Sequence, residues 1–248
     1  MLNKTTKSGF TLAEVLLTLS IIGIVASMVI PGLINTTNKQ EYVTALKKNY
    51  SAMNSSLRLY MANNGCAGNL RVCISSLSND TDLYNVFKPS LNVTKDCGSA
   101  GGMGCFAKGI SYKSLNPALA DRGVLDNAAS TYKIQLADGA SIAFDLQDSS
   151  CSLSSGYLAE DPLLHTCGYF SVDVNGAKAP NQAGRDLFQF FITASGIYPK
   201  GMNNDLDYAY ANGMPGCDPA SANDSSSPRE GRGHGCTAKV ILEGVMNY

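Results

Sequence analysis

The chain has 248 residues, of which 44% are hydrophobic and 16% charged, and 19 basic against 20 acidic residues leave a formal net charge of -1. This near balance excludes bulk electrostatic attraction to nucleic acid or to anionic lipid, so partners have to be recognised by shape and by specific contacts. The hydrophobic content suffices for a packed core, and the length suits one domain behind an N-terminal helix.

An apolar run from Phe10 to Ile34 contains a single charged residue, Glu14. As a helix this run is roughly 37 Å long at about 1.5 Å per residue, enough to cross a hydrocarbon core of about 30 Å. A carboxylate in such a span costs on the order of 2.5 to 3.5 kcal/mol at the helix centre, and less near an end, so it needs a partner. The nearby sequence offers none. A new amino terminus, made by cutting another copy of the chain between Gly9 and Phe10, would supply one.

The stretch Gly9-Phe10-Thr11-Leu12-Ala13-Glu14-Val15-Leu16 resembles the prepilin processing motif of type IV pilins and type II secretion pseudopilins. In that family a membrane aspartic peptidase cuts after the glycine, the exposed phenylalanine is N-methylated, and the glutamate guides packing into a helical filament. The resemblance therefore implies processing between Gly9 and Phe10, N-methylation of Phe10 and an assembly role for Glu14. Gly23 and Pro31 also fall where pilin helices often carry a glycine and a kinking proline.

Two other readings of the N-terminus are an ordinary signal peptide and a plain membrane anchor. Lys4 and Lys7 would supply the basic n-region of a signal peptide. The apolar run is longer than a usual h-region of about 7 to 15 residues and carries Glu14 inside it, which argues against a signal peptide. A plain membrane anchor would not explain why the apolar run contains the charged residue Glu14.

Eight cysteines all lie beyond the apolar run. An even number in a presumed exported part predicts a disulfide framework formed in an oxidising compartment, with pairing between neighbours along the chain. The alternative is a zinc site, but the sequence has no Cys-x-x-Cys pair, and its two histidines, His165 and His234, have unsuitable spacings. The cysteines are Cys66, Cys73, Cys97, Cys105, Cys151, Cys167, Cys217 and Cys236.

The same features predict the topology. Lysines of the 1–9 leader stay in the cytoplasm, and the cysteine-rich part, residues 65–248, is exported. The expected location is the bacterial inner membrane, crossed once by residues 10–34, and after assembly a periplasmic or cell-surface filament.

Beyond Pro31 the sequence becomes amphipathic over residues 35–64. Apolar residues recur every three to four positions, which is typical of one helix face, and Asn63-Asn64-Gly65 supplies residues that end helices. A helix is therefore expected from about Phe10 to Asn63, with a bend at Pro31, because proline removes one backbone donor and clashes with the preceding turn. The apolar positions are Tyr42 or Val43, Leu46, Tyr50, Met53, Leu57 and Tyr60 or Met61.

The stretch from Gly65 to Gly109 is rich in Ser, Asn, Gly and Cys and predicts loops with a short helix near Leu83–Phe87. Disulfides Cys66–Cys73 and Cys97–Cys105 would restrain this stretch. Each would stabilise the folded state by about 2 to 4 kcal/mol, because it limits the unfolded chain. The segment Gly102–Ala107 matches the glycine spacing of a dinucleotide-binding motif. The sequence predicts neither a strand before it nor a βαβ unit around it, so a dinucleotide site is not expected.

From Thr131 the pattern changes to period two. Tyr132–Leu136 and Ile142–Leu146 flank Asp138-Gly139 and predict a hairpin. Cys167–Val174 and Leu187–Thr193 read as further strands, giving an antiparallel sheet of about four. The amphipathic helix is the expected cover for its apolar face, so the predicted fold is α+β, a long N-terminal helix packed on a small antiparallel sheet with disulfide-stapled loops.

The connection Asp173-Val174-Asn175-Gly176 and Pro180 to Asp186 is similar to strand-loop-strand segments of pseudopilin-like proteins. Asp173, Asn175, Asn181 and Asp186 carry oxygen ligands that suit calcium. Turn formation and loop capping are the alternative, because Asn-Gly and Pro-Asn form turns without any metal, and no other cofactor is expected.

From Gly201 to Gly235 the composition predicts an exposed loop. Pilins often close such a loop with a disulfide, here Cys217–Cys236, after which Lys239–Leu242 is expected as an edge strand. Arg229 and Arg232 near His234 could touch phosphate, but a solvated loop is the preferred reading, and no nucleic acid is expected as partner.

The sequence shows no catalytic triple, phosphate loop or metal-ligand spacing, so it predicts a structural protein and not an enzyme. The expected function is a pilin or pseudopilin subunit of a type IV pilus or type II secretion-like filament. Its partners would be copies of itself or related pilins, the prepilin peptidase and an inner-membrane assembly platform. The alternatives are a minor pilin that acts as a tip adhesin or DNA-binding module, and an anchored disulfide-rich domain that never polymerises.

Overall fold

The computed structural model describes Gly9 and residues 11–66, 68–73, 77–155, 161–202, 205, 217–222 and 230–248, with the exception of the side chains of residues 34, 35 and 230. The chain divides into two compact units, residues 1–40 and residues 41–248. Helix α1 (Leu12–Asn63) runs across this division. The other helices are α2 (Asp80–Phe87) and α3 (Cys236–Glu243), with single 3-10 turns η1 (Leu70–Val72), η2 (Lys88–Ser90), η3 (Leu125–Asn127), η4 (Pro162–His165) and η5 (Glu230–Arg232).

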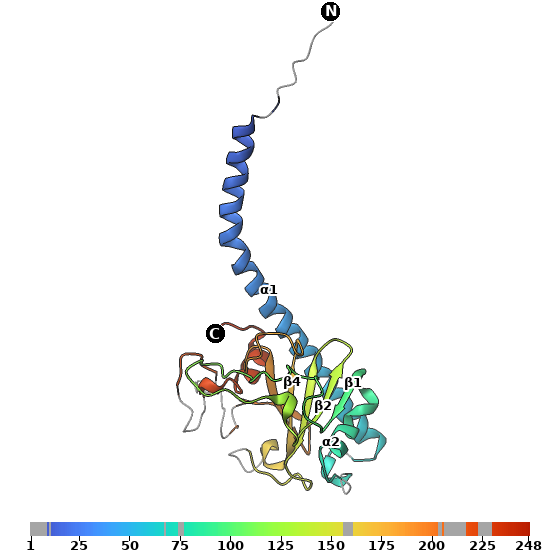
Figure 1. Cartoon of the computed structure of the whole chain (residues 1–248). Coiled ribbons are helices and arrows are strands. Elements are labelled where there is room, and N and C mark those ends of the chain that lie inside the picture. Colours follow the sequence, from blue (N-terminus) through green and yellow to red (C-terminus); the bar gives the residue numbers. More distant parts are fainter. Residues whose placement is uncertain are drawn as a thin grey trace, which may run out of the picture. The chain divides into compact units, whose positions relative to one another are not determined.

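The unit that begins at Glu41 is built on one antiparallel sheet in the order β1-β2-β3-β4-β5-β6 (Figure 1). The predicted hairpin is confirmed: β2 and β3 pair Ile134 with Ile142 around Gly139, whose φ of 90° needs a residue without Cβ. The strands are β1 (Val93–Gly98), β2 (Tyr132–Leu136), β3 (Ser141–Leu146), β4 (Thr166–Asp173), β5 (Leu187–Thr193) and β6 (Ile197–Pro199).

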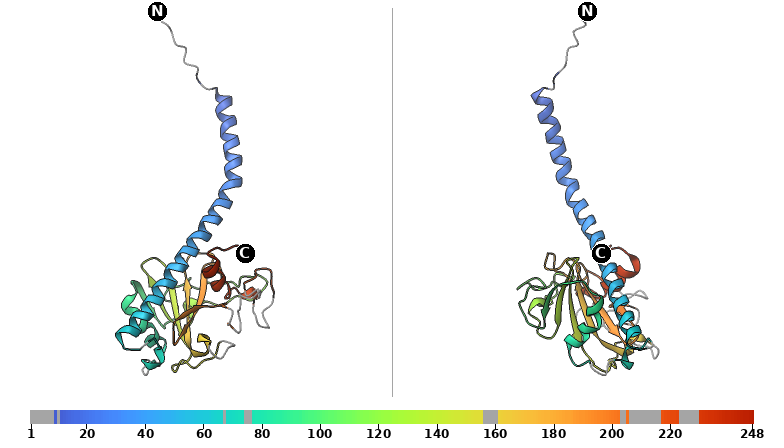
Figure 2. Two further views of the ribbon diagram at one scale, coloured as in Figure 1. Left: turned by 180° about the vertical axis from the view of Figure 1, so that it is seen from behind. Right: turned by 90° about the vertical axis from the view of Figure 1, so that its right-hand side faces the viewer.

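The amphipathic part of α1 covers one face of this sheet, as its periodicity predicts (Figure 2). Leu46 and Met53 are fully buried there. The Tyr50 ring stacks on Phe190 of β5 with centroids 5.3 Å apart, and Phe190 stacks on Phe170 of β4 at 4.8 Å. The α+β fold class is confirmed, and its main core lies between helix and sheet.

A second, smaller core lies on the opposite face, where the sequence predicted no cover. Phe106 and Tyr112, from the long β1–β2 connection, are fully buried with Ala143 and Leu187 of the sheet. The buried Asp126 carboxylate holds this connection by accepting hydrogen bonds from the backbone N–H of Gly104 and Phe106. Both faces of β3 and β4 are therefore covered, which explains why most residues along these two strands are buried.

Two expectations about elements were wrong. Within the described residues the sheet has six strands and not about four, because β1 forms inside a stretch predicted as loops and β6 adds a short edge. Lys239–Leu242 lies in helix α3 and not in an edge strand. The helical period buries Ala238 and Val240 together, and Gly244 ends the helix in the left-handed conformation at φ 73°. The short helix before Pro89 is confirmed as α2.

All eight cysteines form disulfides between chain neighbours, as predicted. The bridges are Cys66–Cys73, Cys97–Cys105, Cys151–Cys167 and Cys217–Cys236, with sequence separations of 7, 8, 16 and 19.

Peptide mapping without reduction is expected to find these four linked pairs and no free thiol, because every cysteine has its partner in place. Replacing Cys151 and Cys167 together by serine should cost about 3 kcal/mol, since the loop closed by that bridge is about 15 residues long. Mass spectrometry of envelope-derived protein with and without alkylation measures the first effect, and thermal unfolding the second. Two or more free thiols would contradict the framework.

Candidate functional site

The N-terminal end of α1 carries the predicted processing and assembly residues. Gly9 is exposed and precedes the helix, whereas Phe10 lies outside the described residues. Helix α1 begins at Leu12, so Thr11 is its N-cap. The Thr11 Oγ1 accepts a hydrogen bond from the Glu14 backbone N–H at 3.3 Å, and Glu14 Oε2 accepts one from the Thr11 backbone N–H at 2.9 Å. This reciprocal pair is a capping box.

The expectation that Glu14 has no nearby partner was therefore wrong. Besides the backbone N–H, the Thr11 hydroxyl donates to Glu14 Oε2 at 2.9 Å. The Thr-x-x-Glu spacing at the start of an apolar run is the sequence signal that could have identified Thr11. Among the described residues, the second carboxylate oxygen, Oε1, accepts no hydrogen bond, so the cap uses only half of the carboxylate.

Between Thr11 and Leu33 no side chain of the single chain is buried. Leu12 is 80% exposed and Met28 75%, which is unfavourable for large apolar side chains in water. Helix α1 is long and apolar enough to cross a membrane by length and composition. This surface needs lipid or other protein around it.

The hydroxyl groups in the apolar half of α1 are satisfied within the helix. Thr18 donates to the Val15 carbonyl, Ser20 to Leu16 and Ser27 to Ile24, at 2.7 to 3.0 Å. Such bonds let polar side chains sit in an apolar environment at low cost. Glu14 is thus the one charged group in this half of the helix.

Helix α1 continues through Pro31, and the predicted kink there stays a prediction. Built onto Gly23, a Cβ atom would meet nothing within 4 Å, and the same holds for Gly32. Among the described residues, no contact therefore requires glycine at either place. Small residues at such positions let a second helix approach closely.

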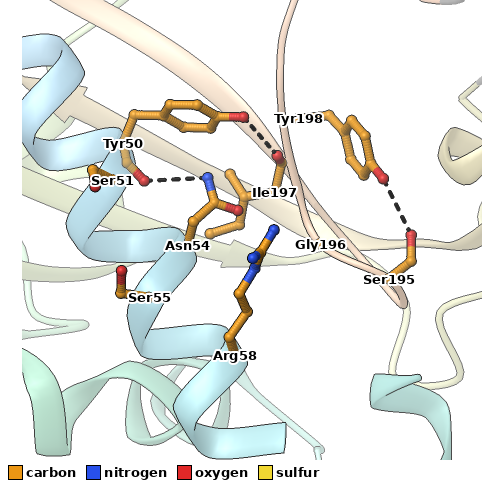
Figure 3. Close-up of a pocket in the computed structure, with 9 residues that line it drawn as sticks. All are labelled: Tyr50, Ser51, Asn54, Ser55, Arg58, Ser195, Gly196, Ile197 and Tyr198. Atoms are coloured by element: carbon orange, nitrogen blue, oxygen red, sulfur yellow. Dashed lines mark hydrogen bonds between the residues drawn. The ribbon is translucent and has the colours of Figure 1, made fainter. Parts of the chain in front are cut away.

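A groove of about 460 Å³ lies between α1 and the edge strand β6, within the second unit (Figure 3). Its lining is polar: the Tyr50 hydroxyl donates to the Ile197 carbonyl at 3.3 Å, and Ser195 and Tyr198 share a hydrogen bond at 3.4 Å. Arg58 extends into it from α1. In the part of the chain that the structure describes, the groove has no acid, base and nucleophile arranged for catalysis. Its other lining residues are Ser51, Asn54, Ser55 and Gly196.

The four calcium candidates lie together on the β4–β5 connection. Asp173 Oδ1 accepts from the Asn175 backbone N–H at 3.2 Å, and Asp186 Oδ2 accepts from the Asn181 backbone N–H at 2.7 Å. Burial, and then the nearby Asp186 charge, raises the pKa of Asp173 well above its usual value. Burial also raises the pKa of Asp186, to about 6. Tyr112 donates a short hydrogen bond to Asp173 Oδ2.

The basic residues near the C-terminal loop do not form an exposed patch among the described residues. His234 is 3% exposed, Arg232 is half-buried, and Arg229 lies outside the described residues. An electrostatic footprint for nucleic acid needs exposed, clustered basic side chains. The described part of this region does not offer one.

Residues 4–30 match the family model described as the prokaryotic N-terminal methylation motif. The match spans the predicted cleavage junction, Glu14 and most of the apolar part of α1. No curated protein and no solved structure matches the chain significantly. The N-terminal segment therefore resembles that of type IV pilin-like proteins, which a prepilin peptidase processes.

Proposed function

We propose that the chain is a structural subunit of a type IV pilus or type II secretion-like filament, processed after Gly9 and assembled through α1. One observation carries the proposal: the methylation motif opens an apolar helix whose side chains, from Leu12 to Leu33, are not buried by the described part of the single chain. Lipid would surround this surface before assembly, and neighbouring helices would surround it in the filament.

Glu14 would select the register of that assembly. Its Oε2 atom is engaged by Thr11, which leaves Oε1 for a donor from outside the chain. Cleavage creates a positively charged amine at Phe10, and an amine and a carboxylate attract strongly where water is excluded. A buried charge is costly unless it is paired. A subunit that leaves either charge unpaired would therefore not be incorporated into the filament.

The domain beyond Glu41 would be exported, with the inner membrane as the site of insertion and a periplasmic or cell-surface filament as the final location. The disulfide framework supports this, because such bridges form in oxidising compartments. The assembly partners would be further copies or related pilins, and an inner-membrane platform. A role as a minor tip pilin is the second candidate, favoured by the polar groove beside β6. No enzymatic role is proposed.

Processing is expected to give a mature chain that starts at N-methyl-Phe10, because the junction Gly9-Phe10, which resembles the prepilin cleavage site, lies within the matched methylation motif. Mass spectrometry of the mature N-terminus, from cells with and without the prepilin peptidase, measures this. Cells that lack the peptidase should keep residues 1–9. A mature start near Ser27 would show ordinary signal cleavage and overturn the proposal.

A further inference from the structure

The polar groove between α1 and β6 has a wall of side chains that a ligand can still engage. This wall is a stripe along α1 whose members recur at spacings of three and four residues and therefore share one helix face. Figure 3 shows Arg58 and Asn54 extending from α1 toward β6. The members of the stripe are Ser51, Asn54, Ser55 and Arg58.

Most of the polar groups on this wall are without a partner. Within the described residues the exposed side chain of Arg58 forms neither a hydrogen bond nor an ion pair, although a guanidinium carries five N–H donors in a planar fork. The hydroxyl groups of Ser51 and Ser55 likewise bind nothing in that part of the chain. Asn54 donates through Nδ2 to the Tyr50 carbonyl at 3.2 Å, which leaves its side-chain oxygen as a free acceptor.

The charge of the groove favours an anionic ligand. No aspartate or glutamate is among its described lining residues, so the positive charge of Arg58 has no counter-charge there. The guanidinium fork matches a carboxylate, which it binds by two parallel hydrogen bonds. Phosphate sites usually add several free backbone N–H groups at a helix N-terminus, whereas the residues of this groove lie in the C-terminal part of α1. One carboxylate would satisfy both the charge and the fork.

A peptide strand added to the sheet edge is not the expected occupant. Strand β6 lies at the edge of the sheet, but the Ile197 carbonyl, on its groove side, already accepts the Tyr50 hydroxyl at 3.3 Å. Pro199, which by strand alternation faces the same side, has no backbone N–H. Strand addition needs a row of free donors and acceptors, and this edge is poor in both.

The size and the lining of the groove point to a small ligand with many hydroxyl groups. Its volume of about 460 Å³ falls in the lower part of the range of roughly 300 to 1,000 Å³ typical of small-molecule sites. An apolar ligand would remove water from these hydroxyl and amide groups without replacing their hydrogen bonds. The half-buried ring of Tyr198 has an apolar body and a polar tip, which suits a ligand with C–H faces and hydroxyl edges. Sugars have this chemistry.

We propose that the groove between α1 and β6 binds a carbohydrate that carries a carboxylate, with Arg58 as the group that pairs with the carboxylate. Ser51, Asn54 and Ser55 bind hydroxyl groups of the sugar, and Tyr198 contacts one of its faces. This binding goes beyond the structural role in a filament and does not depend on it. A chain that never polymerises would still bind the sugar.

The test uses the full chain in a detergent without a sugar headgroup, because a glycoside detergent would compete for the groove. The acidic probes are trigalacturonic acid and sialyllactose. Their neutral controls are the methyl ester of trigalacturonic acid and lactose, which keep sugar rings and lack the carboxylate. Isothermal titration calorimetry should give a Kd of about 0.1 to 1 mM for at least one acidic probe, and binding at least about tenfold weaker for its neutral control.

Two variants of Arg58 separate the charge from the fork. Arg58→Gln should lower the affinity for the acidic probe at least about tenfold and leave that for the neutral control unchanged. Arg58→Lys keeps the charge and loses the fork, so its affinity should lie between those of wild type and Arg58→Gln. Both variants should melt as wild type does, because Arg58 is exposed and has no partner among the described residues.

Arg71→Gln is the matched control for net charge. Arg71 is also exposed and lies on η1, outside the groove, so its substitution changes the charge of the chain equally. Affinity for the acidic probe should stay within about twofold of wild type.

Absence of binding by both acidic probes at about 10 mM, or equal affinity for each acidic probe and its neutral control, would overturn the proposal. So would wild-type affinity in Arg58→Gln. An equal loss in Arg71→Gln would show general attraction by net charge and would overturn it as well. Because binding is measured on the unassembled chain, these outcomes are separate from the test of filament assembly.

Discussion

Glu14→Ala should leave the protein in the membrane and abolish its incorporation into filaments. The apolar half of α1 stays long enough to span the bilayer, and losing a carboxylate makes insertion slightly more favourable. Assembly is different, because the amine of a neighbouring Phe10 would then be buried without its partner. Removing one member of a buried pair typically costs about 3 to 5 kcal/mol.

Because Glu14 also caps the helix, the effect of its charge has to be separated from the effect of the cap. Glu14→Ala also removes the hydrogen bonds to Thr11, so lost capping is an alternative cause of failed assembly. Thr11→Val removes the hydroxyl and costs the helix about 1 kcal/mol, but it leaves the carboxylate in place. Glu14→Gln keeps a capping oxygen and removes the charge. We expect Thr11→Val to assemble and Glu14→Gln to fail.

The measurement is the yield of sheared filaments divided by the amount of protein in the membrane fraction. If Glu14→Ala assembles at wild-type yield, Glu14 is only a helix cap and the plain anchor becomes the better reading. If Thr11→Val fails while Glu14→Gln assembles, the cap and not the charge limits assembly.

Phe190→Ala should be among the most destabilising substitutions in the unit that begins at Glu41. The ring is fully buried and stacks on Tyr50 of α1 and on Phe170 of β4, so it joins the helix to the middle of the sheet. Truncating a buried phenylalanine to alanine costs about 3 to 5 kcal/mol, through lost transfer free energy and the cavity left behind. The melting temperature should fall by roughly 10 °C for a domain of this size.

Leu59→Ala is the matched control, since Leu59 lies on the same part of α1 but is 49% exposed. Its substitution should change the free energy of unfolding by less than about 0.5 kcal/mol. Thermal unfolding of the full chain in detergent, followed by circular dichroism, compares the three proteins. Equal losses for both variants, or none for Phe190→Ala, would contradict the packing of α1 on the sheet.

The sequence alone determined the features that depend on local pattern. A single apolar run with one carboxylate, followed by a stripe of period 3.6, predicted helix α1 up to Asn63. Alternation around Asp138-Gly139 predicted the β2–β3 hairpin, and an even set of cysteines beyond the apolar run predicted four neighbour disulfides. The methylation motif is likewise a contiguous stretch and needs no fold to be recognised.

Only the tertiary structure decided where short apolar segments go. Val240–Leu242 suits a strand or a helix equally, and α3 forms because helical spacing buries Ala238 and Val240 on one face. Strand β1 exists because β2 offers it an edge, although Val93–Gly98 alone has weak strand character.

The candidate sites divide in the same way. Gly9, Phe10 and Glu14 follow from a local motif, and the Thr11 cap follows from a spacing of three residues. The full burial of Asp173 and Asp186 does not follow from the sequence, because the burial of a side chain depends on what packs around it. Local secondary structure depends on residues that are neighbours in the sequence, whereas the environment of a polar atom depends on residues that are distant in the chain.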